Sequence, residues 1–147
     1  MKTNSTKLIG WREWVSLPEF GIEQIKAKVD SGARTSALHA THIRCLHKPD
    51  GSTWVSFLVT AQLSPRRTVR VEAPLVEKRM VRSSLGHATL RPVVVTPIQL
   101  GDQVWPIEIT LINRDPMGFR MLIGRQALKG RYFIHPARSF IQGGQSK

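Results

Sequence analysis

The sequence predicts an all-β domain with one short helix near its C-terminal end. Segments rich in Val, Ile, Thr and Trp follow one another and are separated by turn residues at short intervals, as in β-sheet proteins. Pro74, Pro92 and Pro97 within these segments favour edges, bulges or strand starts. The chain has 147 residues, of which 41% are hydrophobic, and this suits a single globular domain.

The expected strands, in chain order, are 24–30, 37–46, 54–63, 68–75, 78–81, 88–100, 103–113 and 121–123. The connections expected between them, which are rich in Pro, Asp, Gly and Ser, are 49–52, 64–66, 85–86 and 101–102. Such residues are typical of hairpin turns.

Good helix formers at 125–129 are followed by Gly130, which predicts a single short helix. Near the N-terminus, the segment 8–15 is expected to pack on the core through Trp11 and Trp14. The domain is expected to span 8–140, with flexible tails at 1–7 and 141–147.

The charge is strongly unbalanced, with 22 Lys and Arg residues against 10 Asp and Glu residues and a net charge of +12. This excess favours an acidic partner, either nucleic acid or a protein segment rich in Glu and Asp, although a solvated basic surface has the same composition. The basic residues are scattered, without a basic helix or aromatic residues interleaved among them. Nucleic acid is therefore not the favoured partner.

The sequence also favours a cytoplasmic protein. Cys45 is the single cysteine and has no internal disulfide partner. No signal peptide is recognisable behind the polar N-terminus, and no run of about eighteen apolar residues could span a membrane.

Two segments carry the candidate chemistry. Asp30, Ser31 and Gly32 follow an expected strand, and Gly32 allows a tight turn that presents the Asp30 carboxylate. Far downstream, the apolar run 121–123 leads into Gly124 and the short helix. Asp-Ser-Gly alone is also a common turn sequence, so the ordered pair of segments carries more weight than either segment.

An aspartic mechanism needs two carboxylates, one ionised to take a proton from water and one protonated to polarise the peptide carbonyl. The chain contains four aspartates, of which only Asp30 lies in such a motif. An aspartic protease built from this chain would therefore be a homodimer that contributes Asp30 twice across a two-fold axis. Ser31 would brace the two loops through its hydroxyl.

These motifs resemble a bacterial retropepsin-like aspartic protease family known as ATP-dependent zinc proteases. The resemblance rests on the motifs at 10–18, 28–40, 91–94, 107–114 and 121–128 and covers positions 8 to 140. Ser31 stands where Thr is usual in that family, and both residues supply a hydroxyl. The resemblance implies a closed retropepsin barrel with Asp30 as the catalytic aspartate and Gly124 behind its loop.

The resemblance also implies a substrate-covering hairpin, the flap, at 79–90. The residues expected to contact substrate are Ala33, Arg79, Arg82, Ser83, Ser84, Leu85, Gly86, Ile123 and Gly124. Members of the family are associated with an ATP-grasp ligase that adds glutamates to a ribosomal protein. Trimming of such acidic tails is therefore the implied role, and the basic residues near the flap agree with it.

Two alternatives remain open at this point. One is a protease-like fold that serves as a basic binding module on ribosomes or RNA without catalysis. The other is a zinc-dependent hydrolase with ligands among His39, His42, Cys45 and His47, whose spacing matches no established zinc motif. On a continuous strand His39, Cys45 and His47 would share one face. Neither a phosphate-binding loop nor a His-Glu-x-x-His motif occurs, so no cofactor is expected.

Overall fold

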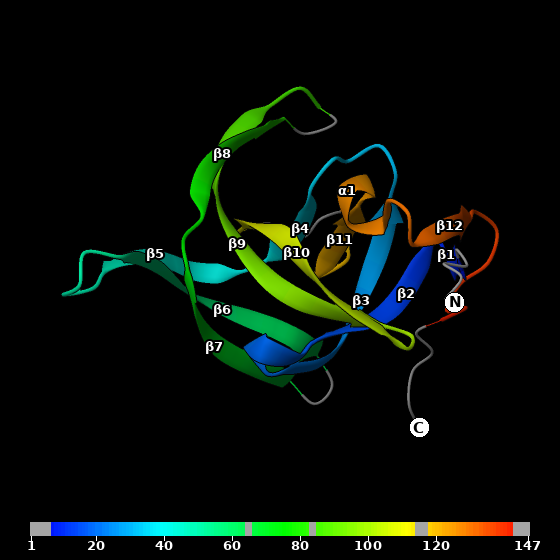
Figure 1. Cartoon of the computed structure of the whole chain (residues 1–147), viewed down its shortest axis with the longest axis horizontal. Coiled ribbons are helices and arrows are strands. Elements are labelled where there is room, and N and C mark those ends of the chain that lie inside the picture. Colours follow the sequence, from blue (N-terminus) through cyan, green and yellow to red (C-terminus); the bar gives the residue numbers. More distant parts are fainter. Residues whose placement is uncertain (1–6, 64–65, 83–84, 114–117, 143–147) are drawn as a thin grey trace, which may run out of the picture.

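The computed structural model describes residues 7–63, 66–82, 85–113 and 118–142 (Figure 1). The elements, in chain order, are β1 (Lys7–Gly10), β2 (Arg12–Leu17), the 3-10 helix η1 (Pro18–Phe20), β3 (Ile22–Asp30), β4 (Ser36–His39), β5 (Thr41–His47), β6 (Thr53–Leu63), β7 (Arg66–Pro74), β8 (Glu77–Arg82), β9 (Ala88–Leu100), β10 (Gln103–Ile112), β11 (Met121–Gly124), α1 (Arg125–Leu128) and β12 (Tyr132–His135).

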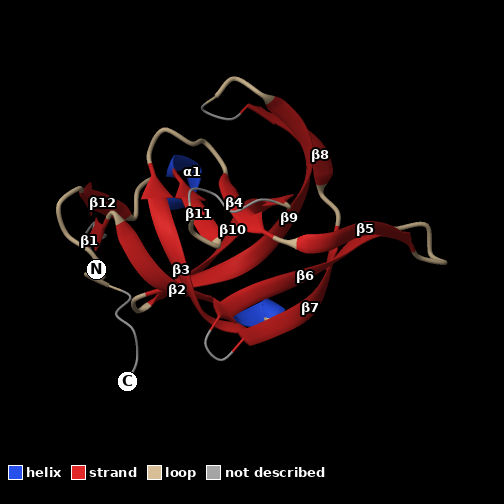
Figure 2. Cartoon of the chain, turned by 180° about the vertical axis from the view of Figure 1, so that it is seen from behind, coloured by secondary structure: helices blue, strands red, loops and turns tan. Residues whose placement is uncertain are grey.

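The central sheet is a closed ring of strands. Its order is β10-β4-β11-β3-β2-β9-β8, and β9 also pairs with β10, so the six strands from β10 to β9 close on themselves. β8 pairs with β9 and extends outward from the ring. Figure 2 shows the predominance of strands, with α1 and η1 as short helical turns. The all-β prediction and the short helix before Gly130 are confirmed. None of the described helices has the length and apolar character that a membrane span requires.

A second sheet of three strands, β5-β6-β7, packs against one side of the ring. Val55, Phe57 and Val59 alternate along β6 and are fully buried. The Phe20 ring of η1 meets Phe57 edge to face at 5.6 Å between centroids. Each fully buried side chain of this size contributes roughly 1.5–3 kcal/mol, and the shared core therefore joins the two sheets into one unit.

Three strands were not expected from the sequence. β2 lies in the ring beside β3, and β1 pairs in parallel with β12 in a separate two-stranded sheet. The alternation of β2 is concealed because an inward position holds Glu13, which is fully buried. Trp11 and Trp14, expected to be the core anchors, are half-buried. Tertiary contacts thus determine that these segments form strands, which their local composition does not indicate.

Glu13 is buried at the corner where the two ends of the domain meet. Its carboxylate accepts hydrogen bonds from the backbone N–H groups of Gly10 at 2.7 Å, Ile141 at 2.9 Å and Gln142 at 3.1 Å. Bonds from backbone donors offset the cost of burying a carboxylate. These bonds tie Ile141 and Gln142 to β1 and β2, so the segment after β12 is joined to the N-terminal strands.

The expected strand 37–46 is interrupted. β4 ends at His39 in the ring, and β5 begins at Thr41 in the second sheet. Between them Ala40 is fully buried, and its N–H donates to Ile112 O at 3.0 Å. The chain therefore changes sheets at Ala40, and the side-chain alternation expected across 37–46 is not maintained.

Tyr132 offers a prediction about stability at high pH. It is the single tyrosine of the chain, it is buried, and its O–H donates to Leu100 O at 2.8 Å. Burial, followed by the charge of Asp102, raises the pKa of Tyr132 from 10.0 to about 12. The unfolded chain ionises at the lower pKa, so the free energy of unfolding should fall as pH rises from about 10 to 12.

Absorbance titration of tyrosinate isolates this group because the chain has no other tyrosine. We expect a midpoint near pH 12 in the folded protein and one near 10 in denaturant. In Tyr132→Phe the tyrosine contribution to the alkaline loss of stability should disappear. A midpoint near 10 in the folded protein would contradict the buried, hydrogen-bonded phenol.

Candidate active site

Asp30 is the last residue of β3, at the point where β3 lies beside β11. The two strands run parallel, and Asp30 is the register partner of Gly124. The Oδ1 atom of Asp30 accepts a hydrogen bond from the N–H of Gly32 at 2.9 Å, and the N–H of Ala33 donates to Asp30 O at 3.1 Å. These bonds form a tight turn that holds a half-buried carboxylate beside the exposed Ser31 and Gly32.

Gly124 permits a close approach between β11 and the loop after Asp30. A Cβ atom at this position would lie 2.7 Å from the carbonyl carbon of Thr35 and 2.9 Å from that of Arg34. The Gly124 N–H donates to Ser36 Oγ at 3.1 Å, and Ser36 O accepts from Thr110 Oγ1 at 3.1 Å. Because the close neighbours are backbone atoms, any larger residue at 124 would have to displace the loop.

The start of α1 binds the other side of the same loop. The N–H groups of Arg125 and Gln126 donate to Ala33 O at 2.8 Å and Arg34 O at 3.1 Å. The Arg125 guanidinium donates through Nη1 to Ser31 O and Gly32 O, both at 3.3 Å. The loop that carries Asp30 is thus tied at several backbone positions, as a catalytic loop requires.

Sequence reasoning placed Gly124 in the site but missed two residues that support it. Ser36 is buried within an apolar strand, and a buried hydroxyl usually marks a specific hydrogen bond. Arg125 directly follows Gly124, where the sequence indicated only the start of a helix. A polar residue in an apolar strand was the available signal for Ser36, whereas the carbonyl partners of Arg125 depend on the folded loop.

The hairpin expected at 79–90 is present in β8 and β9. Met80 is paired with Leu90 and Arg82 with Ala88. Near the tip, Leu85 is 82% exposed and Arg82 Nη1 donates to Gly86 O at 2.8 Å. The remaining tip residues Ser83 and Ser84 lie outside the described residues. In Figure 1 the hairpin rises from the ring and arches over at the same end of the molecule as α1 and the β3–β4 loop. Its role as a flap remains a prediction.

Arg79, expected to contact an acidic substrate, is bound by two carboxylates of the chain. Its Nε donates to Glu77 Oε2 at 2.7 Å, and its Nη1 donates to Glu108 Oε1 at 2.9 Å. The hydrogen bond to Glu108, followed by that to Glu77, raises the pKa of Arg79. Glu108 lies on β10, so Arg79 ties the base of the hairpin to the ring and its charge is already neutralised.

A cleft of about 550 Å³ lies between the Asp30 loop, the base of the hairpin, β10 and α1. Its lining residues are Arg34, Thr35, Ser36, Arg79, Trp105, Pro106, Ile107, Glu108, Gln126, Ala127, Lys129 and Arg131. Ile123, expected to contact substrate, is fully buried and packs in the core. The cleft therefore adjoins the candidate site through the segment that follows Asp30.

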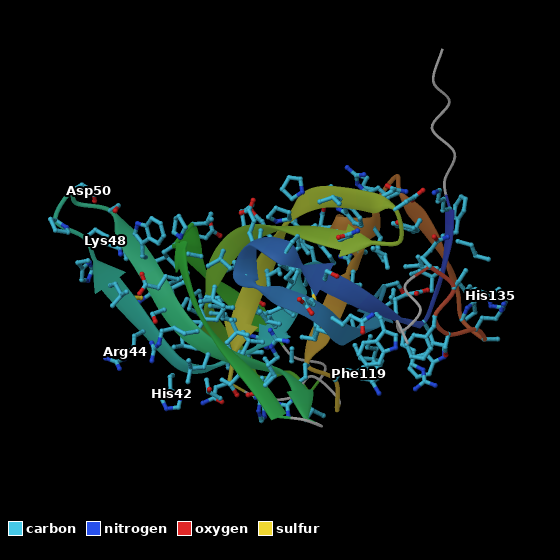
Figure 3. The ribbon with its side chains drawn as sticks, turned by 90° about the horizontal axis from the view of Figure 1, so that it is seen from below. His42, Arg44, Lys48, Asp50, Phe119 and His135 are labelled. Carbon is cyan, nitrogen blue, oxygen red and sulfur yellow. The ribbon has the colours of Figure 1, made fainter. Side chains whose placement is uncertain are left out.

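The four candidate zinc ligands do not form a cluster. His39 ends β4 in the ring, whereas Cys45 and His47 belong to β5 in the other sheet. His42 has a positive φ of 53° at a register shift in β5, and Figure 3 shows it pointing outward from this strand. Across the part of the chain that the structure describes, no three His, Cys, Asp or Glu side chains are grouped as metal ligands would be. The expectation of a common face for His39, Cys45 and His47 was wrong, because the chain changes sheets at Ala40.

Comparison with known proteins identifies the family. Residues 8–145 match the family described as retropepsin-like aspartic endopeptidase RimB. The chain belongs to this RimB-like family. The expected retropepsin-like family is thereby confirmed, and the match covers the Asp30 loop, Gly124 and the hairpin.

Relatives of the RimB-like chain include proteins named probable alpha-L-glutamate ligase. The protein from Desulfotalea psychrophila is 49% identical over 142 residues, and that from Shewanella pealeana is 45% identical over 137 residues. These matches cover 96% and 92% of the chain. The chain itself spans about 30% of the length of these curated relatives.

Among solved structures, the RimB-like chain is similar to a Legionella pneumophila protein described as having unknown function (DUF785). The TM-score is 0.75 at 29% sequence identity. The match covers 94% of this chain and 99% of the other. The two proteins therefore share the fold over nearly their whole lengths.

Proposed function

We propose that the chain is a homodimeric aspartic endopeptidase in which each protomer contributes Asp30 to one catalytic pair. The observation that carries this proposal is the geometry of the Asp30 loop. A half-buried carboxylate is held by the Gly32 N–H at 2.9 Å, lies beside Gly124, and is supported from behind by α1. Membership of a retropepsin-like aspartic endopeptidase family supports the same chemistry.

In this proposal the second carboxylate comes from another copy of the chain, because no described aspartate lies beside Asp30. Asp50 lies in the turn between β5 and β6, and Asp102 lies between β9 and β10, where it pairs with Lys7 at 2.7 Å. Asp115 lies outside the described residues. A two-fold axis that passes beside Asp30 would bring the two carboxylates together from identical loops.

In the proposed reaction, the ionised Asp30 removes a proton from a water molecule, and this water attacks the carbonyl carbon of the peptide bond. The protonated Asp30 of the other protomer donates its proton to the carbonyl oxygen, giving a neutral tetrahedral diol. The C–N bond then breaks as the amine nitrogen takes the proton that the first Asp30 removed from water, and a diol hydroxyl gives its proton to the Asp30 of the other protomer, which restores the starting pair. Two carboxylates at hydrogen-bond distance share one proton, so the pair supplies both the base and the acid.

The proposed substrate is an acidic protein segment in the cytoplasm, such as a glutamylated ribosomal protein. The net charge of +12 favours an acidic partner. The similar proteins that are named probable alpha-L-glutamate ligase also connect this domain with glutamate chemistry. A glutamate-rich peptide is therefore the substrate to test first.

Sedimentation of the wild-type protein at micromolar concentration, with and without a glutamate-rich peptide, tests the assembly. Cleavage of the same peptide, read by mass spectrometry, tests the reaction. We expect a dimer and cleavage within the peptide. A strict monomer in both conditions would leave Asp30 without its partner and would contradict the proposed mechanism.

A further inference from the structure

The cleft beside the Asp30 loop has an excess of positive charge that the fold itself does not use. Arg34, Arg79, Lys129 and Arg131 line it, and Glu108 is the one acidic residue among the described lining residues. Arg79 is already bound to Glu77 and Glu108. The other three cations are therefore the ones available to a ligand.

Two of these cations are exposed and unengaged. Within the described residues, the side chains of Arg34 and Lys129 have neither an ion pair nor a hydrogen bond. Arg34 lies in the loop after Asp30, and Lys129 follows α1, whose Gln126 N–H donates to Arg34 O at 3.1 Å. Unpaired charges of one sign within a concave surface raise the local potential and attract ligands of opposite sign.

Arg131 is held in place. Its guanidinium carbon lies 4.6 Å above the Trp105 ring, and its Nη1 donates to Gln103 Oε1 at 3.1 Å. Trp105 is itself buried, with its indole N–H bonded to Ala127 O at 3.0 Å. A guanidinium oriented by stacking loses little freedom on binding a carboxylate, and its planar donors match carboxylate oxygens.

We propose that this cleft is a carboxylate-binding subsite, in which Arg34, Lys129 and Arg131 receive acidic side chains of a peptide. The inference rests on the proposed function for the identity of the peptide as substrate. The sequence indicated Arg79 as a residue that binds an acidic substrate. The proposed subsite instead uses cations from the Asp30 loop and from the segment that begins at α1. Arg34 lies four positions after Asp30 in a loop fixed by α1, so a side chain bound here would flank the scissile bond.

The cleft favours a peptide over RNA. Binding of single-stranded nucleic acid generally combines cations with exposed aromatic rings on which bases stack. Trp105 is the one aromatic residue among the described lining residues, and it is buried beneath Arg131. The cleft thus offers charge and guanidinium donors without a stacking surface.

The test measures binding in an Asp30→Asn background, so that cleavage does not consume the probe. The probes are a fluorescent ten-residue polyglutamate, the matching polyglutamine and a single-stranded RNA of equal charge. Arg34→Glu and Lys129→Glu are the test variants, because both side chains are exposed and lack partners among the described residues. Arg44→Glu is the control, since it makes the same charge change on β5, where Figure 3 shows Arg44 pointing outward.

We expect polyglutamate to bind in preference to polyglutamine, with affinity that falls as salt increases. Arg34→Glu and Lys129→Glu should each weaken polyglutamate binding roughly tenfold or more, because each places a like charge beside the ligand. Arg44→Glu should have a much smaller effect. Melting temperatures of all three variants should match that of the parent, because exposed, unpaired side chains contribute little to stability.

Equal polyglutamate affinity in the parent and both cleft variants would overturn the subsite. The subsite would also be overturned if RNA bound more tightly than polyglutamate and the cleft variants lost this RNA binding, because the cleft would then be a nucleic-acid site. Cleft-dependent polyglutamate binding in a protein that never cleaves peptides would support the subsite while the proposed peptidase function fails. The two proposals are therefore distinguished.

Discussion

Asp30→Asn is expected to reduce peptide cleavage by about three orders of magnitude or more, because an amide can neither take a proton from water nor return one to the intermediate. The structure of the loop should survive. Asn is nearly isosteric with Asp, and its amide oxygen can still accept the hydrogen bond that the Gly32 N–H makes at 2.9 Å. The loss of catalysis is measured by the rates at which the wild type and Asp30→Asn cleave a glutamate-rich peptide. The stability of the loop is checked by thermal unfolding of both proteins.

Asp50→Asn is a matched control. Asp50 Oδ1 accepts a hydrogen bond from the backbone N–H of Ser52 at 2.9 Å, which is the same local geometry that Asp30 has with Gly32. Asp50 lies at the exposed end of the β5–β6 hairpin, at the left of the view in Figure 3. Cleavage should be unchanged in Asp50→Asn. If Asp30→Asn cleaved the peptide at the wild-type rate, the aspartic mechanism would be excluded.

Gly124→Ala is the second substitution with a large expected effect. The added methyl group would lie 2.7 Å from the Thr35 carbonyl carbon and 2.9 Å from the Arg34 carbonyl, and these are backbone atoms that cannot rotate away. We expect a loss of about 2–3 kcal/mol in the free energy of unfolding, as for other overpacked sites. That corresponds to a fall of roughly 5–10 °C in Tm. Cleavage should also fall, because the displaced loop carries Asp30.

Gly130→Ala separates crowding from a general effect of replacing glycine. Gly130 has a positive φ of 77°, but a Cβ atom there meets nothing within 4 Å. Its substitution should cost about 1 kcal/mol for the left-handed conformation and leave cleavage intact. If Gly124→Ala were no more destabilising than Gly130→Ala, the close packing of β11 against the Asp30 loop would be contradicted.

The sequence was informative where local chemistry and structure coincide. The strand and turn pattern predicted the all-β class, and the family resemblance implied the closed barrel and associated Asp30 with Gly124. The structure makes these two residues register partners on parallel strands. Their proximity follows from the strand topology. The family resemblance predicted it although the two motifs lie far apart in the chain.

The sequence was less informative where a residue depends on distant partners. β2 escaped detection because Glu13 occupies an inward position, which backbone donors from residues 141 and 142 make tolerable. Arg79 looked like a free cation because Glu108, its partner, lies 29 residues away in the chain. The zinc alternative assumed a continuous strand, whereas Ala40 marks a change of sheet.

Subunit mixing tests the shared catalytic pair most directly. Wild-type protein and Asp30→Asn are combined in different ratios at constant total concentration, equilibrated to allow exchange of subunits, and assayed for peptide cleavage. If each site needs Asp30 from both protomers, activity should follow the square of the wild-type fraction, so an equal mixture retains about a quarter of wild-type activity. A linear dependence, with about half of the activity in the equal mixture, would show that one Asp30 suffices and would contradict the homodimeric mechanism.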